Sequence, residues 1–366
     1  MKSANSGENP QAAISQIQQN TDKMLADLMQ TSGGQIAEML FAFDLDGTLK
    51  LDATKGDYIF AHYGMDFVDY LIQKEVAVSI ITHNQNPLKV YDQLATKLGV
   101  EIPADLKQRI LRSEQQRSEL ERQWIGLPPA EKQKYSGGFL RYSLATNPSY
   151  CETLKSLVDE VSALLPAKLK IVTKLDFTLE DQGLVPTDTA GVNNGELGEK
   201  QNSPRMTEIA MNKHGLVQPK AIVIVGDDHI ETKHAVLVKQ HCRQNLKFDP
   251  EVISIVTRLD QAKERVETIR SNLTTTFCPT FINRLLGGRC TDTTQADNNP
   301  EVKAYEHSVR SYNEFSEHSS RHANQHNVLR AEVTTYELLP HLVSSLCQKR
   351  QNQSKAPSQA AEIFRE

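Results

Sequence analysis

The segment that most constrains the fold is 41–49, in which a short apolar run ends in two carboxylates, Asp44 and Asp46, followed by Gly47 and Thr48. Such a run predicts a buried strand that carries acidic groups to its C-terminal end, where open α/β sheets bind their ligands. Gly47 lets the chain leave the strand in a sharp turn, so we expect both carboxylates to stay near one small volume. Two acids held this close favour a divalent cation and phosphoryl chemistry.

Four further apolar runs have a similar form, and they are residues 76–81, 169–173, 221–225 and 252–256. In the run at 76–81 the β-branched residues are packed without alternation, which indicates a strand buried on both faces, as in a parallel sheet. Segments with helical spacing lie between these runs. Strand and helix therefore alternate from about residue 39 to 256, and this pattern predicts an α/β fold with a doubly wound, mainly parallel, Rossmann-like sheet.

Changes in composition divide the chain into three parts. Residues 1–36 are rich in Gln, Asn and Ser, and we expect a polar N-terminal arm that is flexible or weakly docked. Residues 37–290 hold the α/β domain, in which 95–165 is expected to form a helical, cap-like insertion. Residues 291–366 are polar, and we expect a C-terminal extension that is partly helical and partly disordered.

The C-terminal extension carries two apolar patterns with helical spacing. They predict one helix over 302–312 and a second over 329–342, which Pro340 would kink. From about residue 350 onward we expect disorder.

The totals for the whole chain exclude several classes of protein. The 366 residues carry a formal net charge of −5, and no long basic block points to nucleic acid or to a membrane surface as a partner. No stretch has the length of a membrane-spanning helix, and the polar start lacks the apolar part of a secretory signal, so we expect a soluble, cytoplasmic protein. The five cysteines are scattered without a Cys-x-x-Cys pair, which favours reduced thiols.

Polar residues follow three of the predicted strands. Asp44 and Asp46 end the first strand, Thr82 follows the run at 76–81, and Asp227 and Asp228 follow the run at 221–225. Because parallel strands place their carboxyl ends on one rim of a sheet, we expect these groups to converge although they lie far apart in the chain.

The order and spacing of these residues, with Lys200 placed 27 residues before Asp227, resemble the haloacid dehalogenase (HAD) superfamily, most of whose members are phosphatases. The family's four motifs are matched, in order, by 44–48 (Asp-x-Asp-Gly-Thr), Thr82, Lys200, and Gly226-Asp227 with Glu231. The resemblance covers about 39–260 and leaves both tails and the helical insertion unexplained.

The resemblance implies a role for each matched residue. Asp44 would be the nucleophile that forms an aspartyl-phosphate. Asp46 would protonate the leaving oxygen and then act as the base for the hydrolytic water. Mg²⁺ would take oxygens from Asp44, from the backbone carbonyl of Asp46 and from Asp227. Thr82 and Lys200 would hold the phosphoryl oxygens.

Several assignments have alternatives. The lysines that could replace Lys200 are Lys174, Lys213 and Lys220. Asp228 and Glu231 compete for the position of the supporting acid. His83 and Asn84, beside Thr82, are candidates for substrate contacts, with loop capping as the alternative.

Lys200 lies 118 positions after Thr82, and the stretch between them contains the helical insertion, which is the best candidate for a cap that selects the substrate. If the insertion packs to one side instead, the site is open and accepts a phosphoprotein.

Three histidines of the C-terminal extension, His318, His322 and His326, are spaced four apart and share one face if that segment is helical. This spacing suits zinc or nickel, and a solvated face is the alternative.

The leading hypothesis is a magnesium-dependent phosphomonoester hydrolase whose substrate is a small phosphometabolite or a phosphoprotein. The alternatives are a phosphotransferase, which the same residues can run, and a HAD-fold scaffold protein whose polar tails bind a partner. The extensions also fit a bacterial effector delivered into host cells by non-classical secretion. No feature of the sequence indicates an oligomeric state.

Overall fold

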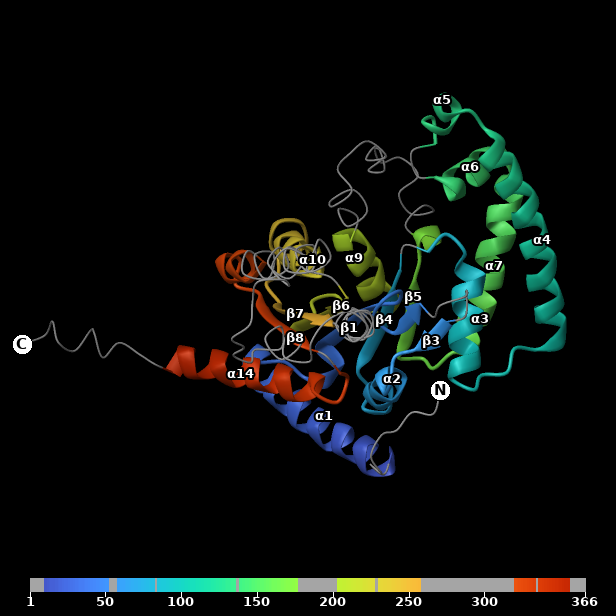
Figure 1. The fold of residues 1–366 in the computed structure, drawn as a ribbon. Helices are drawn as coiled ribbons and strands as arrows, with labels where there is room; N and C mark the ends of the chain where they lie inside the picture. Colours follow the sequence, from blue (N-terminus) through green and yellow to red (C-terminus); the bar gives the residue numbers. More distant parts are fainter. Residues whose placement is uncertain are drawn as a thin grey trace, which may run out of the picture.

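A six-stranded sheet lies at the centre of the computed structural model, which describes residues 10–52, 58–82, 84–135, 138–176, 203–227, 230–257, 319–333 and 335–355 (Figure 1). From one edge to the other the strands are β5 (Leu169–Val172), β4 (Ala77–Ile81), β1 (Met39–Asp44), β6 (Ala221–Gly226), β7 (Glu251–Thr257) and β8 (Leu329–Val333). Every pairing among them is parallel. If only the six strands of this sheet are numbered, from 1 to 6 along the chain, their order across the sheet is 3-2-1-4-5-6. This is the order of doubly wound, Rossmann-like sheets. The expected α/β fold with a parallel sheet is confirmed.

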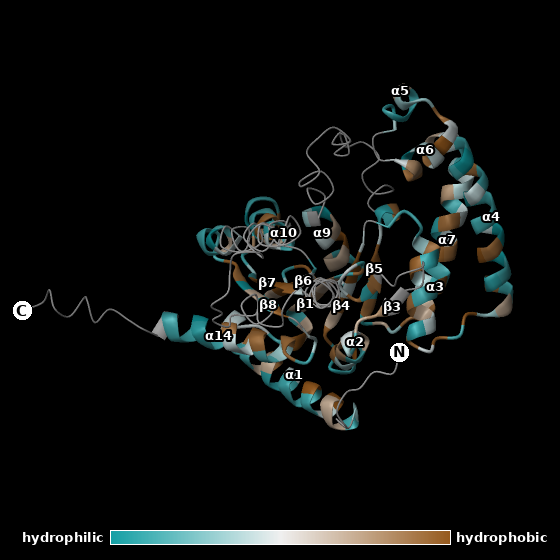
Figure 2. Cartoon of the chain, viewed as in Figure 1, coloured by the Kyte–Doolittle hydropathy of each residue, from teal (hydrophilic) through white to brown (hydrophobic). Residues whose placement is uncertain are grey.

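Alternate residues of each strand contact different helices, as the two-residue period of a strand requires. In β1, Phe41 and Phe43 belong to one apolar cluster, whereas Leu40 and Ala42 belong to a second. Helices therefore cover both faces of the sheet, and the central strands β1 and β6 are buried except at Asp44, the last residue of β1, as in a doubly wound fold (Figure 2).

The helices that cover the first face of the sheet include α1 (Pro10–Ser32), α2 (Gly64–Gln73), α3 (Pro87–Lys97), α7 (Pro148–Leu164) and α14 (Leu339–Lys355). The second face is covered by α9 (Ser203–Lys213) and α10 (Ile230–His241). The remaining described elements are the antiparallel hairpin of β2 (Lys50–Asp52) and β3 (Tyr58–Phe60), the 3-10 helix η1 (Ile36–Glu38), the π-helix η4 (Cys242–Leu246), and α4 (Ala104–Gly126), α5 (Pro129–Lys132) and α6 (Phe139–Thr146).

The N-terminal arm differs from the flexible or weakly docked segment that its composition suggested. Its residues 10–32 form α1, in which Met24 and Leu28 are fully buried. Helix α1 lies along α14, and its Asp27 carboxylate accepts hydrogen bonds from Lys23 and from Ser344 of α14 (Figure 1). The apolar residues of α1 recur at helical spacing, so they form one stripe that the C-terminal helix and the sheet cover.

The C-terminal extension is part of the sheet. The helix predicted over 329–342 is wrong, because Leu329–Val333 is strand β8 and pairs with β7 in the register Ile253↔Leu329. Helix α14 begins only at Leu339, so Pro340 lies in its first turn, where a missing N–H costs little, and causes no kink. The disorder expected from about residue 350 is wrong for residues 350–355, which belong to α14, and the rest of that prediction lies outside the described residues. The helix predicted over 302–312 lies outside the described residues.

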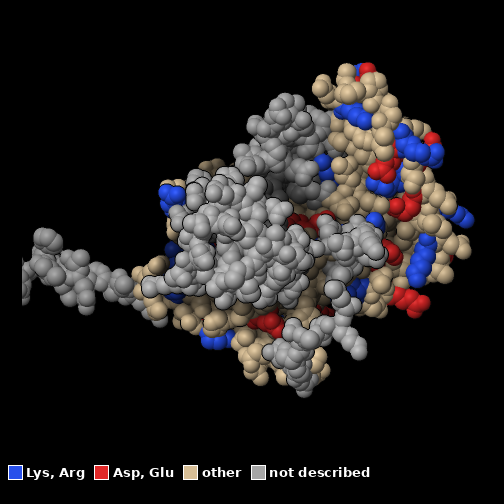
Figure 3. Space-filling view, viewed as in Figure 1, with Lys and Arg blue, Asp and Glu red and all other residues tan. Residues whose placement is uncertain are grey.

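Between β4 and β5 the chain forms a group of helices, and α7 packs against α3, α4 and α6 (Figure 1). Ion pairs cover the outer surface of this group, including Arg109 of α4 with Glu160 of α7 and Lys155 with Asp159. Figure 3 shows both signs of charge interspersed over the described part of this face. Such exposed pairs each contribute little to stability.

The histidine pattern of the C-terminal extension is only partly described, because His318 lies outside the described ranges. The rings of His322 and His326 are 4.8 Å apart between centroids, and Nδ1 of His326 is 3.2 Å from Nε2 of Gln240. Neither histidine belongs to a group of three potential metal ligands among the residues that the structure describes.

Across the described parts of the chain, no helix combines the length and the hydropathy that crossing a membrane requires.

Candidate active site

The site lies where the chain order of the sheet reverses, between β1 and its neighbour β6. Phe43 pairs with Val225 in the parallel register, so Asp44 at the end of β1 lies beside the end of β6, which Asp227 follows. Open α/β sheets bind ligands in the crevice outside the carboxyl ends of two such strands. The fold therefore places both aspartates at the position where a ligand is expected.

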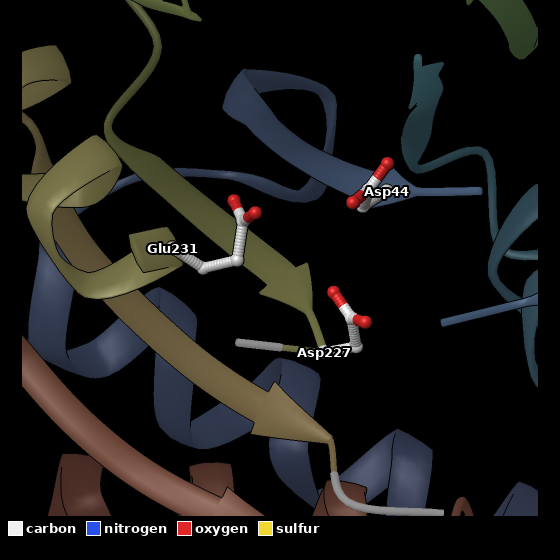
Figure 4. A group of neighbouring side chains, drawn as sticks. All are labelled: Asp44, Asp227 and Glu231. Carbon is white, nitrogen blue, oxygen red and sulfur yellow. The ribbon is translucent and has the colours of Figure 1, made fainter. Parts of the chain in front are cut away.

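Three carboxylates converge at this position. Asp44, Asp227 and Glu231 each offer an oxygen, and these oxygens lie within 4.8 Å of one another. Figure 4 shows the carboxylates of these residues, which come from the end of β1, from the residue after β6 and from the first turn of α10. Asp44 and Asp227 are half-buried, whereas Glu231 is buried. The described residues contain no other group of three histidine, cysteine or acidic side chains placed in this way.

Two glycines have no side chain and so leave space for the side chains of Asp227 and Glu231. Gly47 has φ 80°, and a β-carbon on it would overlap the carboxylate of Asp227. A β-carbon on Gly226 would overlap the side chain of Glu231. Both positions therefore require glycine for steric reasons, and at Gly47 the left-handed backbone is a second reason.

Glu231 is held by a buried chain of polar side chains. Its Oε2 is 3.1 Å from Nδ1 of His234, and Nε2 of the same ring is 3.3 Å from the Thr207 hydroxyl. Because a carboxylate only accepts hydrogen bonds, this arrangement assigns the proton to Nδ1. The spacing of three residues on a helix was a signal available in the sequence, and our sequence analysis missed His234.

The second acid of the first motif, Asp46, does not belong to the group of three carboxylates. The side chain of Asp46 is 49% exposed, and its Oδ1 lies 2.7 Å from Nζ of the buried Lys50. Backbone hydrogen bonds close the turn: the Gly47 N–H donates to the Lys50 carbonyl (2.7 Å) and the Lys50 N–H donates to the Leu45 carbonyl (2.8 Å). The sharp turn expected at Gly47 is present, and the Asp46 carboxylate at its start pairs with Lys50.

Thr82 lies at the same edge of the sheet as Asp44. The register pairs Asp44 with Ile81, so Thr82 is one residue beyond the partner of Asp44. Its hydroxyl accepts a hydrogen bond from the Asn84 N–H (3.2 Å), and the Asn84 side chain accepts one from the Asn86 N–H (2.8 Å). In this structure Asn84 caps the loop, which was the alternative to a substrate contact.

Three of the predicted site residues, His83, Asp228 and Lys200, lie outside the described residues. Of the alternatives to Lys200, Lys220 comes just before β6 begins, at the amino-terminal ends of the strands, whereas the three carboxylates lie at the carboxyl ends.

The other two alternatives lie near the end of β5. Lys213 donates to the Ile171 carbonyl (2.9 Å) and pairs with Asp176. Lys174 is buried two residues beyond the end of β5.

The helices between β4 and β5 contact the loop that follows Thr82. Oε2 of Glu114 in α4 accepts a hydrogen bond from Nδ2 of Asn86 (3.0 Å). A β-carbon on Gly138, at the start of α6, would lie 3.4 Å from the side-chain amide of Gln85. The insertion therefore borders the predicted phosphate-binding loop through α4 and through the start of α6.

Comparisons with protein-family models, with curated proteins and with solved structures found no match.

Proposed function

We propose that this protein is a magnesium-dependent phosphomonoester hydrolase that works through an aspartyl-phosphate on Asp44. The observation that carries the proposal is the convergence of Asp44, Asp227 and Glu231 at the switch point of the sheet. Support also comes from the HAD-like order of the motifs, in which a nucleophilic aspartate ends the first strand.

The three carboxylates suit Mg²⁺. The group offers only oxygen atoms, which are the ligands of hard cations, and it contains no thiolate or imidazole that would select zinc or copper. Asp44, Asp227 and Glu231 would hold the ion, which would supply positive charge to the oxygens of a substrate phosphate. Few protein ligands are needed, because Mg²⁺ usually keeps several waters and also binds substrate phosphate.

Asp44 is the nucleophile in this proposal. The Leu45 N–H donates a hydrogen bond to Oδ1 of Asp44 (2.8 Å), which orients the carboxylate. A carboxylate oxygen attacks phosphorus, a bond forms between that oxygen and the phosphoryl group, and the bond to the leaving oxygen breaks. Water then attacks the aspartyl-phosphate, which releases inorganic phosphate and regenerates Asp44.

Asp46 is the proton donor to the leaving oxygen and then the base for water. Its exposure lets the side chain rotate toward a substrate, but the contact with Lys50 has to be given up or shared for this to occur. Thr82 and Lys200 complete the proposal as donors to the phosphoryl oxygens.

The test of the proposal is the release of p-nitrophenol from p-nitrophenyl phosphate by the full chain, with Mg²⁺ and after treatment with a chelator. We expect Mg²⁺ to increase the rate at least about tenfold, because Asp44 attacks an anionic phosphate beside two further carboxylates. A rate that is unchanged by the chelator would refute the magnesium-dependent reaction. A folded protein with no activity on phosphopeptide, sugar-phosphate and nucleotide panels would favour the scaffold alternative.

A glycine substitution tests whether the geometry of the site matters. We expect Gly47→Ala to weaken Mg²⁺ binding at least about tenfold, because the new β-carbon displaces the carboxylate of Asp227. Titration calorimetry with Mg²⁺ measures the change.

Gly99→Ala is the matched control for this substitution, because Gly99 also has positive φ (68°) and a β-carbon there meets no atom within 4 Å. Both variants carry the strain of a left-handed residue, and only Gly47→Ala adds the clash. Equal Mg²⁺ affinities of the two variants would show that contact between Gly47 and Asp227 does not shape the site.

A further inference from the structure

A fully buried tyrosine from the C-terminal extension reaches the loop that carries the candidate nucleophile. Tyr336 lies between β8 and α14, and its side chain is 1% exposed. Its hydroxyl donates a hydrogen bond to the backbone carbonyl of Thr48 (3.2 Å), although the two residues are 288 positions apart in the chain. Thr48 belongs to the turn between Asp44 and Lys50, so this bond joins the end of the chain to the site.

The ring of Tyr336 is held from two sides. It lies 6.3 Å from the ring of Phe67, which also contacts the rings of Phe41 and Phe43 in β1. A β-carbon on Gly64, at the start of α2, would lie only 3.0 Å from Cε2 of Tyr336. The close packing fixes the hydroxyl in place. A buried tyrosine hydroxyl usually has a hydrogen-bond partner, and here the partner is the Thr48 carbonyl.

The turn that receives this hydrogen bond lies against the side chain of Asp227. Gly47 is the residue before Thr48 and directly abuts the carboxylate of Asp227. A shift of the turn would therefore change the space that is available to the Asp227 carboxylate. Burial raises the pKa of the Tyr336 phenol far above its usual value, and the charges on Asp44 and Asp227 raise it further. The phenol is thus a neutral donor that is near enough to interact electrostatically with both acids.

We infer that Tyr336 is a positioning residue of the metal site, which holds the 45–50 turn so that Asp44 and Asp227 are set at the spacing the cation needs. The inference rests on the proposed function, because it concerns the Mg²⁺ site of that reaction. It assigns the C-terminal extension a part in the site: β8 and α14 flank Tyr336, and α14 is anchored to α1 through Asp27 and Ser344.

The experiment compares Mg²⁺ binding by the full-length wild type, Tyr336→Phe and Tyr91→Phe. Tyr91 is the matched control, because its buried hydroxyl also donates to a backbone carbonyl, that of Ile171 (3.2 Å) in the edge strand β5. Both variants lose one buried hydroxyl and one hydrogen bond to a carbonyl, so a general loss of stability affects both. We expect Tyr336→Phe to weaken Mg²⁺ binding about tenfold and Tyr91→Phe to leave it unchanged.

The outcomes separate this inference from the proposed function. Binding by the wild type with an unchanged affinity in Tyr336→Phe would overturn the positioning role and leave the proposed function standing. Absence of Mg²⁺ binding by the wild type would overturn both.

A second measurement applies if Tyr336→Phe does not fold. 3-Fluorotyrosine placed at residue 336 of the otherwise unchanged chain is expected to show a ¹⁹F shift on saturation with Mg²⁺, whereas the same label at residue 91 is expected to show none. A resonance at 336 that does not move would overturn the inference.

Discussion

Replacing Asp44 with asparagine is expected to lower the rate of phosphate release from p-nitrophenyl phosphate at least about 10³-fold. The amide has the shape of the carboxylate and can still accept the hydrogen bond that the Leu45 N–H donates. It has no negative charge with which to attack phosphorus, so the covalent step is lost while the fold is kept. Initial rates with saturating Mg²⁺ measure the effect, and the same preparations are compared by thermal unfolding.

Asp105→Asn is the control for this variant, because Asp105 is exposed at the start of α4 and does not belong to the group of three carboxylates. We expect it to keep the rate of the wild type. An Asp44→Asn variant that also keeps this rate would rule out an aspartyl-phosphate on Asp44. Beryllofluoride with Mg²⁺ adds an independent readout, since a mimic of the phosphorylated aspartate should protect the wild type from thermal unfolding and should not protect Asp44→Asn.

Replacing Leu28 with alanine is expected to lower the free energy of unfolding by about 2–5 kcal/mol. Leu28 is fully buried in the cluster that joins α1 to α14 and to the sheet, so truncation leaves a cavity that the surrounding helices fill only in part. If α1 were a weakly docked arm, the same change would cost no more than about 0.5 kcal/mol, as surface substitutions do. Denaturation in urea, with the slope compared between variants, measures the difference.

Leu111→Ala in α4 is the control, because Leu111 is 60% exposed. It removes the same atoms from a helix without opening a cavity, and we expect it to change the free energy of unfolding by less than about 0.5 kcal/mol. Equal losses in the two variants would mean that α1 contributes no more to the core than an exposed helix does.

The strands of the sheet were predictable because their signals are local. The run 221–225 is wholly apolar and the run 76–81 is apolar except for Ser79, and each is followed directly by a polar residue or a glycine with an aspartate. A strand buried on both faces needs such a run wherever it lies in a parallel sheet. The pattern therefore predicted both the strand type and the edge at which Asp44, Thr82 and Asp227 would lie.

The parts that prediction missed depend on partners far away in the chain. Helix α1 carries many polar residues, and part of the cover over its apolar stripe comes from α14, about 300 residues later in the chain. The segment 329–333 fits helical spacing as well as strand spacing, and the free edge of β7 decides between them by offering parallel backbone partners. Short segments of this kind take their structure from their neighbours.

The sequence by itself determined the α/β class, the parallel arrangement of the buried strands and the end of the strands at which acidic residues collect. Each of these follows from side chains within a few positions of one another. Only the tertiary structure decided that Glu231 lies with Asp44 and Asp227, that Asp46 pairs with Lys50, and that Tyr336 reaches the Thr48 carbonyl. Those contacts depend on the direction of a turn and on packing between segments separated by up to 288 residues, and neither leaves a periodic signal in the chain.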